Sequence, residues 1–191
     1  MASTFLSAHI AAGDFDRSAL HDNLKWIAAS PDAREIFTPE QIGQLRDLLG
    51  NDVKMEALEQ ILKAKTQLEI NINPESKLSI SRTNAATPKT SCGAFNYWLI
   101  RIDNEAFVTA PLKALPADSF TEKWVSISAM DRPLTGAAVE YRILKFKPDT
   151  SDPIELSLRF NAGPWTHDLG NRSKVPILLL CDTGAGSDRP K

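Results

Sequence analysis

Cysteine and histidine are scarce in this sequence, which has 191 residues but only two cysteines and three histidines. Cys92 and Cys181 are too few for the disulfide framework of a small secreted domain, so we expect free thiols unless the two lie close enough in space to pair. His9, His21 and His167 are scattered and match no zinc-binding spacing. We therefore expect neither a metal nor a cofactor.

Long apolar runs are also missing. The longest one, Val175–Cys181, is interrupted by Pro176 and falls far short of the roughly 20 residues that cross a membrane. Residues 1–12 contain His9 and no basic leader, which is atypical of a signal peptide. We therefore expect no membrane span, no secretion, and a cytoplasmic or virion location.

The chain carries little net charge, −2 in total, so the whole molecule is not an obvious binder of polyanions. The two parts differ slightly. Residues 1–73 hold 7 Lys and Arg against 11 Asp and Glu, whereas residues 74–191 hold 15 against 13. The second part has the sign that a weak contact with nucleic acid requires.

Signals that start helices fill the first third of the chain. Ser30 before Pro31 is typical of an N-cap followed by proline at the first helical position. Thr38 and Gln41 have the spacing of a capping box. Apolar residues recur there at helical spacing and predict three or four short helices, with Leu20, Leu24, Ile27, Ile42, Leu45, Leu48, Leu49, Met55, Leu58, Ile61 and Leu62 facing inward.

From Leu68 onward the hydrophobic period changes to the alternation of β-strands. Trp98 shares a face with Ile100 and Ile102, so we expect it to anchor the core. No helical pattern separates the strands, which favours antiparallel pairing. The predicted strands lie within 68–73, 78–81, 98–102, 125–129, 139–147, 154–161 and 175–181, with loops at 111–119 and 161–174.

These patterns predict an α+β protein in two parts. A short N-terminal helical bundle or arm, about residues 4–66, precedes an antiparallel β-sandwich or barrel, about residues 68–182. As domains, we predict a helical region 1–66, a β-sandwich-like domain 67–182 and a flexible tail 183–191. We expect the helices to matter more for association than for the stability of the β core; the alternative is that they pack directly on the sheet.

One short string near the end of the sequence invites an enzymatic interpretation. Asp182, Thr183 and Gly184 follow an apolar run and resemble the strand and Asp-Thr-Gly turn of aspartic proteases. In that family two such carboxylates share a proton, whereas this sequence contains one copy. We therefore expect Asp182 to be a turn residue, and we predict no catalytic residue.

A second candidate is the long loop 161–174. It combines an aromatic residue, an imidazole, a carboxylate and a guanidinium, which are groups that binding sites use. The candidates for ligand binding on this loop are Trp165, His167, Asp168 and Arg172. In the alternative interpretation, Trp165 closes the end of the β core and His167 is exposed to solvent.

Basic residues on the predicted strands form a third candidate. Lys145 and Lys147 share a face by the period of two, and Arg142 points to the opposite one. A basic sheet face can bind phosphates, although the aromatic and basic alternation of an RNA-recognition sheet is missing. The candidates for nucleic-acid contact are Arg101, Arg142, Lys145, Lys147 and Arg159.

No acid/base pair, activated nucleophile or phosphate-cradling loop stands out, so we expect a protein that is not an enzyme. Helices followed by a β domain are the layout of many assembling subunits, among them viral coat and matrix proteins. We predict a self-assembling, capsid-like structural subunit that forms homo-oligomers and contacts nucleic acid weakly through its β domain. Two alternatives remain: a monomeric, lectin-like ligand-binding module that uses loop 161–174, and a hydrolase.

Overall fold

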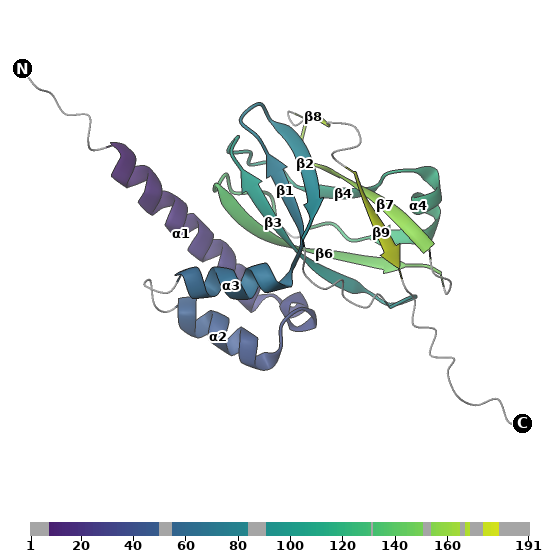
Figure 1. Cartoon of the computed structure of the whole chain (residues 1–191), viewed down its shortest axis with the longest axis horizontal. Helices are drawn as coiled ribbons and strands as arrows, with labels where there is room; N and C mark the ends of the chain where they lie inside the picture. Colours follow the sequence, from purple (N-terminus) through teal and green to yellow (C-terminus); the bar gives the residue numbers. More distant parts are fainter. Residues whose placement is uncertain are drawn as a thin grey trace, which may run out of the picture.

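The structure is a computed structural model that describes residues 8–49, 55–83, 91–130, 132–150, 154–164, 167–168 and 174–179. Helices and strands both contribute, as predicted, so the protein belongs to the mixed α+β class (Figure 1). The helices are α1 (Ala8–Ala29), the 3₁₀ helix η1 (Pro31–Glu35), α2 (Pro39–Leu49), α3 (Met55–Lys65) and α4 (Ser119–Trp124). The strands are β1 (Thr66–Ile72), β2 (Lys77–Arg82), β3 (Asn96–Asn104), β4 (Lys113–Pro116), β5 (Val125–Ile127), β6 (Val139–Pro148), β7 (Ile154–Asn161), β8 (His167–Asp168) and β9 (Lys174–Leu179).

The predicted helix caps are present. The Ser30 hydroxyl accepts a hydrogen bond from the Asp32 N–H at 3.3 Å, and Pro31 occupies the start of η1. Thr38 and Gln41 form the reciprocal capping box: the Gln41 N–H donates to Thr38 Oγ1 at 3.3 Å, and the Thr38 N–H donates to Gln41 Oε1 at 3.1 Å. Both devices satisfy backbone donors that have no partner inside the helix.

Strand pairing departs from the antiparallel prediction. The larger sheet has six strands in the order β5-β6-β3-β1-β2-β8, and the smaller has three in the order β4-β7-β9. In the larger sheet β1 pairs with β3 in parallel, and so does β2 with β8, whereas the other pairs are antiparallel. After the β1–β2 hairpin, the chain between Arg82 and Asn96 is long enough to bring β3 to the free side of β1.

Two segments that were predicted as loops contain helix or strand residues. The first is the 111–119 segment, which contains β4 and the start of α4. Asp118 caps α4 by accepting a hydrogen bond from the Thr121 N–H at 2.7 Å. The second is the 161–174 segment, which contains the two-residue strand β8. A strand of two residues is too short for alternation to be recognised.

Trp98 anchors the core between the sheets, as predicted. It is 1% exposed and shares its cluster with Ile100 and Ile102. Its ring meets the edge of Phe146, with ring centroids 5.2 Å apart and planes at 85°. Leu158 from the smaller sheet joins the same cluster. The larger sheet curls into a half-barrel around this core (Figure 1), and the antiparallel sandwich is not confirmed.

A second hydrophobic cluster joins the helices to the outer face of the larger sheet. Leu99 from β3 and Tyr141 and Ile143 from β6 pack against apolar residues of α1, α2 and α3. The Asn23 side chain of α1 accepts from the Tyr141 N–H at 2.7 Å and donates to its carbonyl at 3.2 Å. Burial raises the pKa of Tyr141 to about 12. The helices therefore pack directly on the sheet and contribute to the core of the subunit, in addition to the role in association that we expected for them.

The expectation of free thiols is corrected at one position. Cys92, in the turn before β3, is disulfide-bonded. Disulfides persist mainly in oxidising surroundings, so this bond does not support the expected cytoplasmic location. Cys181, the other cysteine of the sequence, lies outside the described residues.

Candidate interaction site

An apolar groove runs between α2 and α3 and encloses about 590 Å³. The inward-facing sides of both helices are used in the helix–sheet cluster, through residues such as Leu45 and Leu58. The neighbouring stripe of each helix faces the groove. It is lined by Gln41, Gln44, Asp47 and Leu48 from α2 and by Ala57, Gln60, Ile61 and Ala64 from α3.

The residues that line this groove have the chemistry of a site that contacts another protein. Leu48 and Ile61 are half-buried and provide alkyl contact, while Ala57 and Ala64 are small enough to leave room. Three glutamines also line the groove, and Asp47 is the one formally charged residue in the lining. An apolar centre with a polar rim is the usual build of a protein–protein contact.

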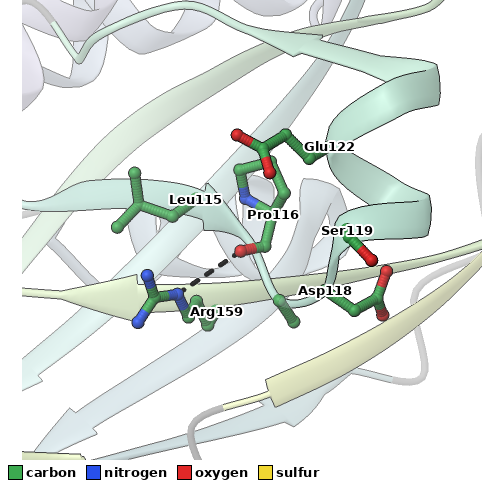
Figure 2. Close-up of a pocket in the computed structure, with 7 residues that line it drawn as sticks. Leu115, Pro116, Asp118, Ser119, Glu122 and Arg159 are labelled. Atoms are coloured by element: carbon green, nitrogen blue, oxygen red, sulfur yellow. Dashed lines mark hydrogen bonds between the residues drawn. The ribbon is translucent and has the colours of Figure 1, made fainter.

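A second, polar pocket of about 430 Å³ lies where β4 leads into α4 (Figure 2). Arg159 projects from β7 on one side and donates from Nε to the Pro116 carbonyl at 3.3 Å. Asp118 and Glu122 lie on the α4 side. The Asp118 carboxylate is already engaged in capping α4. The pocket therefore contains charged groups of both signs, and two of them, Arg159 and Asp118, are engaged in hydrogen bonds within the fold.

The predicted loop site is only partly described. His167 and Asp168 form β8, which pairs in parallel with Lys77 and Leu78 at the edge of the larger sheet. Trp165 and Arg172 lie outside the described residues, and so does Asp182. The ligand-binding role of loop 161–174 and the turn role of Asp182 therefore remain predictions.

Arg142 is a correction to the predicted nucleic-acid contacts. Its side chain is 1% exposed and forms an ion pair with Glu140, with Nη2 and Oε2 2.6 Å apart. It also donates to the carbonyls of Tyr141 at 2.7 Å and Pro133 at 2.6 Å. A guanidinium that is enclosed and committed in this way cannot reach a phosphate.

Three more of the predicted cations are paired with carboxylates. Arg101 lies 2.8 Å from Asp103, and Lys147 lies 3.3 Å from Asp149. Lys145 is 3.7 Å from Asp32 of η1. Arg159, the fifth, lines the polar pocket with two acids. The five residues therefore do not form one basic surface.

Two aromatic residues that the prediction missed surround Lys145. Its Nζ lies 4.7 Å from the Phe95 ring centroid and 5.2 Å from that of Tyr97, its direct cross-strand neighbour. Phe95 is 48% exposed. A hydrogen bond with Tyr97, together with the nearby charge of Asp32, raises the pKa of Lys145. Alternation along β3 indicates the facing of Tyr97, but only the register shows that Lys145 lies opposite it.

Comparison with known proteins finds no matching family model, no matching curated protein and no matching solved structure. In the part of the chain that the structure describes, no helix is long and apolar enough to cross a membrane. Among the same residues, no group of three or more His, Cys, Asp or Glu side chains could hold a metal ion.

Proposed function

We propose that this chain is a non-enzymatic structural protein that self-associates, in the manner of a coat or matrix subunit. The α2–α3 groove is the observation that carries the proposal. Half-buried Leu48 and Ile61 line this concavity of about 590 Å³, together with three glutamines. A concave apolar surface of this kind gains free energy when another protein covers it.

A second copy of the chain is the proposed partner at this groove. The lining holds one formal charge, Asp47, so the groove has little electrostatic attraction for a strongly charged partner. The chain as a whole carries a net charge of −2, so like-charge repulsion between copies is small. Both features favour contacts between identical subunits.

Static light scattering of the purified chain over a range of concentrations tests this proposal, and the expected result is a species larger than a monomer. Ala64→Lys places a long, charged side chain in the groove and should weaken association at least tenfold, because it occupies the space that a partner would fill and its charge is costly to bury. Ala29→Lys is the matched control, because Ala29 is exposed at the end of α1 and does not line the groove. A monomer at all concentrations would contradict the proposal.

A weak contact with single-stranded nucleic acid is the second candidate function. The patch formed by Phe95, Tyr97 and Lys145 favours it, because an exposed ring beside an ammonium can stack on a base and meet its phosphate. Asp32 pairs with Lys145, and Asp149 pairs with the neighbouring Lys147, so the net attraction of this region for phosphates is small.

Fluorescence anisotropy with a labelled single-stranded RNA measures this contact. Phe95→Ala is expected to lower the affinity about tenfold, since stacking contributes roughly 1–3 kcal/mol per base. Phe120→Ala removes an exposed phenylalanine on α4 and should leave the affinity unchanged. Equal losses for the two variants, or no binding by the unaltered chain, would rule out the patch.

A further inference from the structure

Phe107, in the connection between β3 and β4, combines two unfavourable features. It is 66% exposed, the most of the large hydrophobic side chains that the structure leaves at the surface. Its backbone φ is +54°, in the left-handed region, which a bulky residue rarely adopts. A glycine would remove both disadvantages at once, because it has no side chain to expose and adopts this backbone freely.

The turn that carries Phe107 is firmly built. The side chain of Asn104, which is fully buried, accepts from the Val108 N–H at 2.9 Å and donates to the Val108 carbonyl at 2.9 Å. The Phe107 N–H donates to the Asn104 carbonyl at 3.3 Å. The chain on both sides of Phe107 is thereby fixed, and the phenyl ring is held outward.

A second loop supports the turn from behind. Gly136 packs so closely that a β-carbon there would lie 3.3 Å from the Phe107 carbonyl oxygen and 3.1 Å from Thr109 Cγ2. The Leu134 N–H donates to the Ala110 carbonyl at 3.1 Å and ties the two loops together. The neighbours of Phe107, Ala106 and Val108, pack against the core, whereas Phe107 does not belong to that cluster.

A strained backbone and an exposed ring, held by a fixed turn, suggest that the ring is used outside its own subunit. Its own α2–α3 groove is not within reach of the turn. β1 begins at Thr66, directly after α3, and β3 runs parallel to it, so Asn104 lies at the end of the sheet away from Lys65. Figure 1 shows α2 and α3 on the side of the molecule where β1 begins.

We infer that Phe107 of one copy inserts into the α2–α3 groove of another copy. This inference rests on the proposed self-association and names its contact. The groove offers Leu48 and Ile61 to the faces of the ring, and Ala57 and Ala64 leave space for it. A projection and a groove on different parts of one chain form a heterologous contact, which builds rings or open chains of subunits.

Phe107→Gly is the decisive variant. It is expected to weaken association at least tenfold in light scattering, while the melting temperature of the dilute monomer stays the same or rises. Phe107→Asn removes the ring with a residue that also tolerates the left-handed backbone, and it should behave alike. Phe120→Ala, at a ring that is 53% exposed on α4, should associate like the unaltered chain.

Mixing two defective variants tests the heterologous geometry. Phe107→Gly keeps its groove and Ala64→Lys keeps its projecting ring, so an equimolar mixture should form a 1:1 complex and nothing larger. If the unaltered chain associates and Phe107→Gly associates equally well, this inference is wrong and the proposed self-association stands. If the unaltered chain is monomeric throughout, both are wrong.

Discussion

Trp98→Ala is expected to lower the free energy of unfolding by about 3–5 kcal/mol, the usual loss when a buried aromatic side chain is truncated. Trp98 is 1% exposed and lies in the cluster that joins the two sheets. Its edge-to-face contact with Phe146 would be lost together with its burial. Because small domains are stable by only about 5–15 kcal/mol, the variant should be close to unfolding.

Urea unfolding followed by circular dichroism measures this loss. Trp124→Ala is the matched control, because Trp124 is half-buried at the end of α4, where the Lys123 ammonium lies 4.8 Å from its ring centroid. We expect the control to lose clearly less stability than Trp98→Ala. Equal midpoints for Trp98→Ala and the unaltered chain would show that the core does not depend on this ring.

Glu140→Ala is expected to destabilise the protein by about 3–5 kcal/mol, because it leaves a buried charge without its partner. The Glu140 carboxylate is fully buried and accepts from the Thr135 N–H at 2.8 Å and from the Gly136 N–H at 3.2 Å. It also pairs with Arg142, whose Nη2 lies 2.6 Å away. One carboxylate therefore holds a loop and a buried guanidinium together.

The remaining bonds of Arg142 cannot replace this carboxylate. Its Nη2 also donates to the Pro133 carbonyl at 2.6 Å, but its buried Nε has no hydrogen-bond partner among the described residues. The guanidinium carbon lies 5.9 Å from the Trp26 ring centroid, which adds only a modest cation–π attraction. Without Glu140, the positive charge would stay in a poorly solvated site.

Thermal and urea unfolding of three variants tests this expectation. Asp149→Ala breaks the exposed ion pair with Lys147 and should cost less than about 1 kcal/mol. The double variant Glu140→Leu with Arg142→Met removes both buried charges and should recover much of the stability that Glu140→Ala loses. A loss for Glu140→Ala no larger than that for Asp149→Ala would contradict the role assigned to the buried pair.

The proposed interaction site was only partly visible in the sequence. Helical spacing indicates that Leu48 and Ile61 belong to the apolar faces of their helices, and both do contact the helix–sheet cluster. Spacing does not show that they lie at the margin of that cluster, where two helices leave a groove. Phe107 carried no signal at all, because a left-handed backbone at phenylalanine follows from the surrounding bonds of Asn104.

The basic candidates show the same limit. Alternation correctly separates Arg142 from Lys145 on β6, but it does not show how far each face is covered. The Arg142 side chain is enclosed. On the opposite face the helices bury Tyr141 and Ile143, whereas Lys145 lies beyond them beside Phe95 and Tyr97. Residues of β3 and β6 are far apart in the sequence, so their meeting depends on sheet pairing.

Features that depend on neighbours along the chain could be predicted from the amino-acid pattern alone. The caps at Ser30 and Thr38 follow from hydrogen bonds that span two or three residues, and the facing of Trp98 follows from the period of a strand. In contrast, the parallel pairing of β3 with β1, the burial of Arg142 and the groove between α2 and α3 follow from packing between distant parts of the chain. These outcomes depend on which apolar surfaces cover one another after long loops close, and local sequence patterns do not specify such long-range contacts.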